Sequence, residues 1–174
     1  MGKRLLKMEK NEQDFMAMLA RCERIVFKIC LVFTDRQPDS VRDLYQDIVC
    51  NLWQGWGRMR GDSTEGTWVY RVALNTAVNQ LRRHRRTPVI VRLSDEMIAT
   101  LADTRQENLY DKLYRLIDRL DDTDKSLILL YLDNIPSRQI AIITGVGEAT
   151  ARKRIERIKQ KLIKLNEQDN GSIF

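Results

Sequence analysis

The sequence predicts an all-α protein of two small helical domains joined by a linker, the C-terminal one containing a helix-turn-helix. Three observations predict this class. Apolar residues recur at helical spacing along most of the chain. Glycine and proline, which interrupt helices, occur only 8 and 3 times among 174 residues. Near the C-terminus a short helical segment, a glycine-containing turn and a long basic helix follow one another, which is the helix-turn-helix order.

Two helices are expected first, separated by a polar break at residues 34–38. The first spans residues 12–33, where apolar residues recur every three or four positions: Phe15, Met18, Leu19, Cys22, Ile25, Val26 and Ile29. Asp39 is the expected N-cap of the second, which ends near residue 54. At 100° per residue its core face consists of Val41, Tyr45, Ile48, Val49 and Leu52.

A third helix is expected over residues 67–86, after a polar loop at 55–66. Its core face consists of Tyr70, Ala73, Leu74, Ala77, Val78 and Leu81. A second stripe contains an aromatic, two amides and three arginines: Trp68, Val72, Asn75, Asn79, Arg82, Arg83 and Arg86. Stacking surface, base-edge hydrogen bonding and phosphate attraction on one face suit single-stranded nucleic acid. A partly buried tryptophan beside an ordinary polar face is an equal alternative.

Residues 87–106 have a weak pattern and are expected to be a linker, with at most a short helix at 95–101. It separates a first domain, 1–86, from a second, 107–174. The second domain begins with two short helices, and Asp121–Asp124 is expected to cap the latter. The helix-turn-helix then consists of a helix at 137–143, a turn at 144–146 and a basic helix at 148–165.

Positive charge is concentrated in that last helix. The formal charge of the chain is +6, and residues 152–164, with seven basic side chains and one acid, account for all of it. Apolar residues lie on one side, and Arg152, Lys153, Arg157, Gln160 and Lys164 lie on or beside the other. The helix is therefore expected to pack through one side and to read a DNA major groove with the other. A merely solvated basic face is the alternative.

Catalysis has little support in the sequence, and no cofactor or metal is expected. His84, the only histidine, lies in a run of arginines, and no cluster has metal-ligand spacing. Asp39, Asp43 and Asp47 share a helix face but have no phosphate-binding companion. The three cysteines, at positions 22, 30 and 50, are expected to be buried free thiols. No segment is apolar enough to enter a membrane, so a cytoplasmic location is expected.

Three motifs resemble a known family, the extracytoplasmic-function (ECF) group of bacterial RNA polymerase sigma factors. Thr67–Ala77 is close to the family's T-W-L-Y-R-I-A-x-N pattern. Asp43–Ile48 together with Trp53 resembles its D-L-x-Q-E-x-F…W segment. Ile140-Ala141 followed by Thr150–Arg154 resembles its I-A…T-V-x-S-R segment. The resemblance covers residues 15–86 and 113–165, with the motifs in the family's order.

The resemblance implies a protein that is not an enzyme but directs the polymerase to promoters. Asp43, Gln46 and Asp47 would bind the clamp helices of the beta-prime subunit of core RNA polymerase, and the beta flap would bind the other domain. The melted −10 element would be bound by Arg60, Gly61, Asp62, Ser63, Trp68, Asn75, Asn79, Arg82 and Arg83. The −35 element would be read as duplex by Thr150, Arg152, Lys153 and Arg157. An anti-sigma factor is a further partner that the resemblance implies.

The chain departs from the family pattern at four positions. Glu65 stands where an aromatic is usual, Gln139 replaces a glutamate, Gly147 replaces an N-cap serine, and Asp121 stands where proline is common. A stand-alone helix-turn-helix regulator, dimerising through its first helices, is the alternative function, and a nucleic-acid-processing enzyme is a third. The stripe with Asn75 and Asn79 favours the sigma factor, because a dimerisation helix needs no face for single strands.

Overall fold

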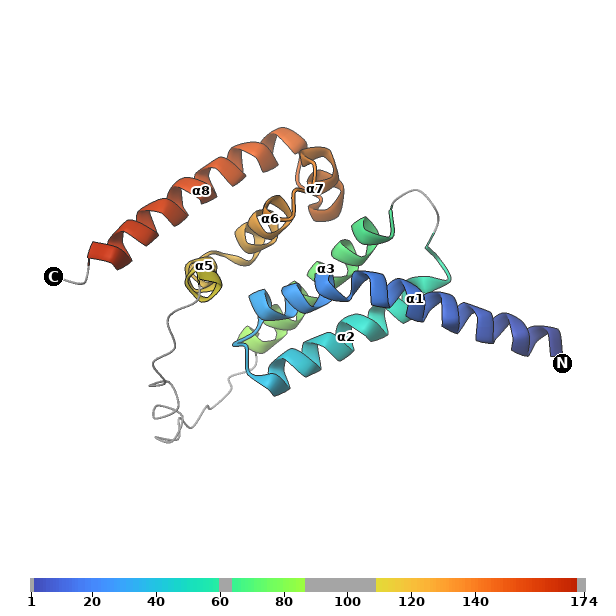
Figure 1. Ribbon diagram of the computed structural model, residues 1–174. Helices are drawn as coiled ribbons and strands as arrows, with labels where there is room; N and C mark the ends of the chain where they lie inside the picture. Colours follow the sequence, from blue (N-terminus) through green and yellow to red (C-terminus); the bar gives the residue numbers. More distant parts are fainter. Residues whose placement is uncertain (1, 60–63, 87–108, 172–174) are drawn as a thin grey trace.

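The computed structural model describes residues 2–59, 64–86 and 109–171, and every regular element there is a helix. Figure 1 shows their order along the chain. The helices are α1 (Gly2–Phe33), α2 (Pro38–Trp56), α3 (Glu65–Arg86), α5 (Leu109–Asp118), α6 (Asp122–Leu132), α7 (Ser137–Thr144) and α8 (Glu148–Gly171). The all-α prediction is confirmed. The linker expected at 87–106, with its short helix at 95–101, lies outside the described residues.

Helices α1, α2 and α3 pack against one another as a three-helix unit, and the N-terminal turns of α1 project beyond the other two (Figure 1). Of the seven α1 residues expected in the core, six are buried and Ile25 is half-buried. On α3, Tyr70, Ala73, Leu74 and Ala77 are buried as expected, whereas Val78 and Leu81 are half-buried at the edge of the core. The helical period therefore located the buried sides of α1 and α3 well.

The core face of α2 differs from the predicted one. Leu44, Ile48 and Leu52 are buried, while Val41, Tyr45 and Val49 are only half-buried. Helix α2 contacts both α1 and α3, and the side that faces them consists of Leu44, Ile48 and Leu52 rather than the predicted residues. The predicted cap is also wrong: α2 starts at Pro38, Gln37 is the N-cap without a side-chain hydrogen bond, and Asp39 lies in the first turn. Proline at this position costs no hydrogen bond, since the first N–H groups of a helix have no partner.

Helices α5–α8 form a four-helix unit that contains the expected helix-turn-helix. The segment Asp121–Asp124 caps α6 as expected, and the N-cap within it is Asp121, whose carboxylate accepts from the backbone N–H groups of Thr123 and Asp124 at 3.0 and 2.9 Å. Gly145 ends α7 with φ 71°, a left-handed conformation that glycine adopts without steric cost. The basic helix α8 begins at Glu148 as expected but continues to Gly171, past the predicted end at residue 165.

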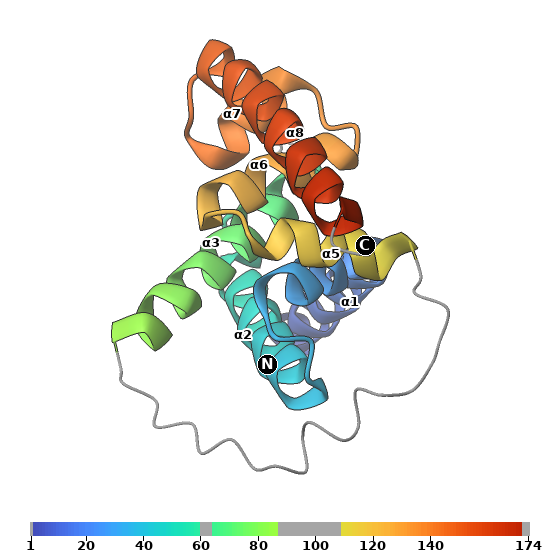
Figure 2. The same ribbon diagram turned by 90° about the vertical axis from the view of Figure 1, so that its left-hand side faces the viewer.

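The two units pack together mainly where α7 contacts α3 and where α5 contacts α1. Figures 1 and 2 show α6 and α7 beside α3 in both views. The buried apolar residues of both units form one continuous cluster. This contact between the units was not expected from the sequence.

The cysteines differ in burial, which corrects the expectation of three buried thiols. Cys22 and Cys30 are buried, whereas Cys50 is exposed on α2. Burial raises the pKa of the Cys30 thiol to about 12 and also raises that of Cys22. Cys50 is exposed because it lies on the side of α2 opposite the buried Leu44, Ile48 and Leu52.

We expect a thiol reagent such as 5,5′-dithiobis(2-nitrobenzoic acid) to modify the folded protein at one site first. The thiolate is the reactive form, and only Cys50 is accessible without unfolding. One equivalent should be released quickly, and two more should appear on adding denaturant. Cys50→Ser should remove the fast phase and leave the slow one. Fast release of three equivalents from the folded protein would contradict the burial of Cys22 and Cys30.

Candidate nucleic-acid interface

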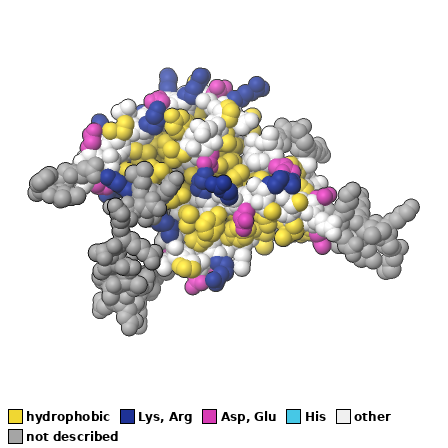
Figure 3. Space-filling view, in the orientation of Figure 1, with side chains coloured by type: hydrophobic (Ala, Val, Ile, Leu, Met, Phe, Trp, Pro, Cys, Tyr) yellow, Lys and Arg dark blue, Asp and Glu magenta, His cyan; other side chains and the backbone are white. Residues whose placement is uncertain are grey.

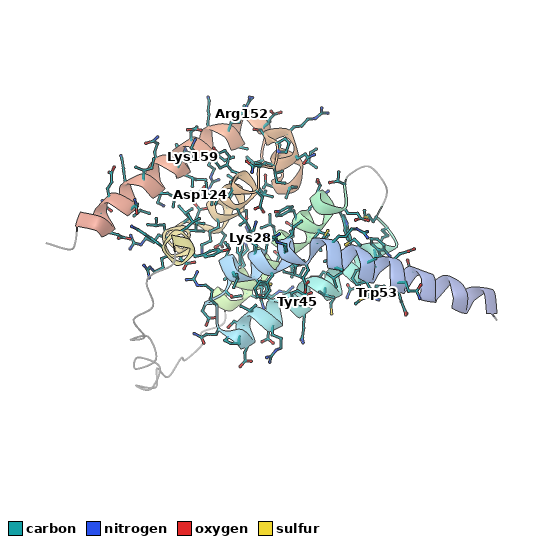
Figure 4. All side chains as sticks on the ribbon, viewed as in Figure 1. Lys28, Tyr45, Trp53, Asp124, Arg152 and Lys159 are labelled. Atoms are coloured by element: carbon teal, nitrogen blue, oxygen red, sulfur yellow. The ribbon has the colours of Figure 1, made fainter. Side chains whose placement is uncertain are left out.

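The exposed side of α8 presents the side chains predicted to read duplex DNA. Ala151, Ile155 and Ile158 are buried against α6 and α7. The opposite side is exposed, and it includes all four predicted −35 residues: Thr150, Arg152, Lys153 and Arg157. Figure 3 shows lysine and arginine side chains along the upper edge of the molecule, where α8 lies. Figure 4 shows Arg152 on this outer edge, away from the three-helix unit.

The single acid within this basic stretch is paired locally. The Glu156 carboxylate accepts from Lys159 Nζ at 2.8 Å, and Lys159 also lies over the Tyr131 ring, 5.4 Å from its centroid. Arg152 lies 4.0 Å from Glu148, one turn back on the same helix. These exposed contacts are weak and break readily in favour of a phosphate or a base edge. The exposed side of α8 is therefore an electropositive, adaptable surface.

Arg154 is directed inward and holds α8 on α6. Its guanidinium pairs with Asp124 and with Asp121, the latter at 3.2 Å, and its side chain is half-buried. Both acids belong to the capped start of α6, so the pair joins the recognition helix to the helix that supports it. Arg154 is a positioning residue, although it occurs within the motif that resembles the family's DNA-reading segment.

The Asp121 carboxylate makes this contact depend on pH. Burial opposes its ionisation, but hydrogen bonds from Asp124 and the charge of Arg154 outweigh burial and lower the pKa of Asp121. A carboxyl with a lower pKa in the folded state stabilises the fold above its unfolded pKa. That contribution is lost as the pH falls through the folded pKa.

We therefore expect the unfolding free energy of the wild-type protein to decrease as the pH falls below about 4, the unfolded pKa of aspartate. Asp121→Asn keeps an N-cap side chain but removes the charge, so its stability should decrease less over the same range. Denaturant unfolding at a series of pH values between about 6 and 2 measures this. Asp39→Asn, on an exposed first-turn residue of α2, is the control. Parallel curves for wild type and Asp121→Asn would contradict the role of this carboxylate.

The stripe on α3 forms a ridge between two hollows. Asn75, Asn79 and Arg82 are exposed. A hollow of about 470 Å³ lies between α2 and α3, where Asn75, Asn79 and Arg83 face Asn51 and Gln54 of α2. A smaller hollow of about 160 Å³ lies on the other side, where Asn75, Asn79 and Arg82 face the four-helix unit. The structure thus brings four of the predicted −10 residues to one ridge and places the two arginines on opposite slopes.

Two amides of α2 were missed by sequence reasoning. Asn51 Nδ2 donates to the Thr76 hydroxyl of α3 at 2.9 Å, which joins the two walls of the larger hollow. Gln54, one turn further along, lines the same wall. No signal in the sequence could have found them, since the hollow exists only once α2 and α3 are packed side by side.

Trp68 belongs to an aromatic cluster at the start of α3. Its ring lies 6.2 Å from that of Trp56, which in turn lies 5.8 Å from Phe15. A Cβ atom added to Gly55 would be 3.1 Å from the Trp68 ring, so a side chain there would force the indole to move. Trp68 is half-buried, which matches the structural alternative stated for it, and its DNA contact remains a prediction. The predicted loop residues Arg60, Gly61, Asp62 and Ser63 lie outside the described residues.

Glu65, which replaces the usual aromatic, has a specific partner in this chain. The Arg21 guanidinium of α1 donates to its two carboxylate oxygens at 2.8, 2.9 and 3.1 Å. The pair is exposed, and it anchors the first turn of α3 to α1 just after residues 60–63. In this chain the position therefore forms an ion pair with α1.

The predicted polymerase-binding residues Asp43, Gln46 and Asp47 are all exposed on one side of α2. Of the three, Asp47 also lines the larger hollow, together with Asn51. Across the described residues, no three His, Cys, Asp or Glu side chains come together as a metal site. None of the described helices is long and apolar enough to cross a membrane.

Comparisons with known proteins agree with this arrangement. The family described as Sigma-70 region 2 matches residues 18–87, and Sigma-70 region 4 matches residues 110–162. The RNA polymerase sigma factor SigV of Bacillus subtilis is 25% identical over 167 residues, which cover 92% of this chain and 98% of SigV. The ECF RNA polymerase sigma-E factor of Escherichia coli is 29% identical over 175 residues, with 90% of this chain and 88% of sigma-E covered.

Solved structures share the fold. The sigma factor RpoE of Bartonella quintana, in complex with the anti-sigma factor NepR, has a TM-score of 0.68 at 17% identity, covering 89% of this chain and 98% of RpoE. CnrH, in complex with the cytosolic domain of CnrY, has a TM-score of 0.66 at 19% identity, covering 91% of this chain and 90% of CnrH. Both family regions match within this one chain and together cover most of its length. The matches therefore favour a sigma factor over a stand-alone regulator. The chain belongs to the sigma-70 family of RNA polymerase sigma factors, in its extracytoplasmic-function group, and acts in promoter-specific initiation of transcription.

Proposed function

We propose that this sigma factor divides promoter recognition between its two helical units, residues 1–86 and 107–174, joined by the linker at 87–106. One observation supports the division above all others: the two units present exposed surfaces of different chemistry. The ridge of α3 offers amides and arginines beside two hollows, whereas the outer side of α8 offers a row of exposed basic side chains. Amides beside a hollow suit splayed bases, and a basic helix on a helix-turn-helix suits an intact major groove.

The outer side of α8 reads the −35 element as duplex. Its N-terminal residues Thr150, Arg152 and Lys153, with Arg157 one turn on, lie where a recognition helix contacts base edges. An arginine fork bonds the O6 and N7 atoms of guanine, so Arg152 and Arg157 are the specificity-determining candidates. The lysines that follow, Lys161 and Lys164, contact phosphates and fix the position of the helix.

The ridge of α3 binds the melted non-template strand of the −10 element. Asn75 and Asn79 supply base-edge hydrogen bonds, while Arg82 and Arg83 on the two slopes neutralise phosphates on either side. Residues 60–63 and Trp68 complete the site by resemblance to the family. Because bases must leave the duplex to enter the hollows, this unit acts after strand opening begins.

Protein partners bind on other surfaces. Asp43, Gln46 and Asp47 on α2 bind the clamp helices of the beta-prime subunit, and the four-helix unit binds the beta flap. An anti-sigma factor is a further partner, as NepR is for the Bartonella quintana sigma factor. The protein itself catalyses no reaction and works in the cytoplasm, where the polymerase supplies the chemistry.

Run-off transcription with purified core polymerase tests this function. Polymerase with the protein added should produce transcripts from specific promoter fragments, whereas polymerase alone should produce none. Asn75→Ala/Asn79→Ala should reduce these transcripts by about tenfold or more, since two base-contacting amides are removed. Asn11→Ala, on an exposed residue of α1, should not change them. Tight binding to an operator without polymerase, and no transcript from any fragment, would instead favour a stand-alone regulator.

A further inference from the structure

Glu156 is an acidic side chain on the basic outer side of α8. Between Arg152 and Lys164 it is the one acid among seven basic residues. Its side chain is 64% exposed, one turn beyond Arg152 and next to Arg157. Together with Arg157 and Gln160 it lines a shallow hollow of about 540 Å³ on this side of the helix. The carboxylate therefore belongs to the surface that would face duplex DNA and not to the side that packs on α6 and α7.

A carboxylate on a DNA-facing helix is unfavourable unless the DNA supplies a partner for it. Phosphates place one negative charge about every 1.7 Å along the duplex, and they repel an acid on the protein. An exposed ion pair within the helix offsets little of this repulsion. Cytosine supplies a suitable partner, because its N4 amine is a hydrogen-bond donor in the major groove and acidic side chains accept from it. Adenine also has an amine there, but its neighbouring N7 is an acceptor and repels a carboxylate.

Lys159 holds the Glu156 carboxylate in one orientation. Lys159 Nζ donates to Glu156 Oε1 at 2.8 Å, and the ammonium lies 5.4 Å from the centroid of the Tyr131 ring on α6. Figure 4 shows Lys159 on the side of α8 that faces α6. Among the described residues no other donor bonds to Glu156, so Oε2 keeps its capacity to accept. The hydrogen bond to Glu156 raises the pKa of Lys159, so the ammonium stays charged and offsets the carboxylate.

We propose that Glu156 is a specificity-determining residue that reads a cytosine of the −35 element through a hydrogen bond from the cytosine N4 amine to Oε2. Lys159 is the positioning residue that holds the carboxylate for this contact. The inference rests on the proposed function of the outer side of α8 as the reader of the −35 duplex. An α-helix rises about 1.5 Å per residue, so Glu156 lies about 6 Å beyond Arg152. The cytosine is therefore expected about two base pairs from the guanine that Arg152 reads.

Two explanations of Glu156 predict changes of opposite sign. If the carboxylate is only a partner of Lys159, its removal frees a cation and removes a repulsion, so every duplex is bound more tightly. If the carboxylate reads cytosine, its removal weakens binding to the duplex with cytosine at one position by about tenfold. Affinity for duplexes with another base at that position should not fall, so the preference for cytosine is lost.

The test titrates the full-length wild-type protein and Glu156→Ala with fluorescent −35 duplexes of a promoter found by run-off transcription. One set of duplexes changes each base pair in turn and locates the cytosine. A further duplex replaces that cytosine with 2-pyrimidinone, which lacks the 4-amino group. The wild-type protein should bind the 2-pyrimidinone duplex about tenfold more weakly than the natural one. Glu156→Ala should bind the two duplexes equally, which also controls for the changed stability of the duplex itself.

Variants of two other residues make the result specific. Glu167→Gln removes an exposed acid on the same side of α8, about 16 Å further along the helix, and it should leave the order of affinities unchanged. Lys159→Met should reduce the discrimination between the cytosine and 2-pyrimidinone duplexes, whereas Lys159→Arg, which can still donate to Glu156, should retain it.

Two results would overturn the proposal. One is tighter binding of every duplex by Glu156→Ala, and the other is equal discrimination against 2-pyrimidinone by Glu156→Ala and the wild-type protein. A wild-type protein that prefers no −35 duplex over an unrelated one would instead overturn the assignment of α8 on which the proposal rests.

Discussion

Leu44→Ala is expected to reduce the free energy of unfolding by about 2–5 kcal/mol, the usual loss for a large apolar side chain removed from a packed core. Leu44 is fully buried between α2 and its two neighbours in the three-helix unit. Truncation leaves a cavity that rigid helices close only in part, so lost burial and lost contacts add. Urea unfolding monitored by circular dichroism measures the change, provided that the midpoint shifts and the slope does not.

Leu31→Ala is the matched control for this prediction. It makes the same chemical change on α1, but Leu31 is half-buried and lines an open groove beside Val41 and Tyr45. The loss of unfolding free energy in Leu31→Ala should be well below that in Leu44→Ala, because solvent already reaches Leu31. The comparison also tests which face of α2 is in the core. The observed face includes Leu44, whereas the face expected from the sequence did not. Equal losses at the two leucines would favour the expected face.

Arg152→Ala is expected to cost about 1–3 kcal/mol of discrimination between the cognate −35 duplex and one with a substituted guanine. Arg152 is exposed near the N-terminus of α8, and its contact with Glu148 is long enough to yield to a base. Removing the guanidinium leaves guanine O6 and N7 without their donors but changes few phosphate contacts. Affinities for a set of duplexes, each with one base pair changed, show which position loses its preference.

Lys164→Ala is the control on the same helix. Lys164 is exposed three turns further along, where a phosphate contact is expected. Its removal should weaken binding to all duplexes alike and should reduce the slope of log affinity against log salt by about 1. Arg152→Ala should instead change the order of affinities among the duplexes. Uniform weakening by both variants would contradict the assignment of Arg152 to base reading.

Local patterns determined most of the fold and the outline of the site. The helical period located the buried sides of α1 and α3 because neighbouring turns of one helix share one environment. Gly145 and the cap at Asp121 were recognisable because each acts within a few residues of itself. The basic side of α8 followed from its period and composition, since a helix that buries Ala151, Ile155 and Ile158 exposes Arg152, Lys153 and Arg157 on its other side.

What the sequence could not determine depends on pairs of residues far apart in the chain. Leu44 faces the core and Cys50 faces solvent because α1 and α3 settle the rotation of α2. Asn51 faces Thr76 only after α2 and α3 are packed, and Lys28 meets Asp133 across 105 residues. Helical propensity and period act over one or two turns and contain no information on which helices touch. By itself the sequence determined the helices, the helix-turn-helix and its basic side. Only the tertiary structure decided that the four-helix unit lies over the α3 ridge, because that contact depends on burial and charge pairing between distant segments.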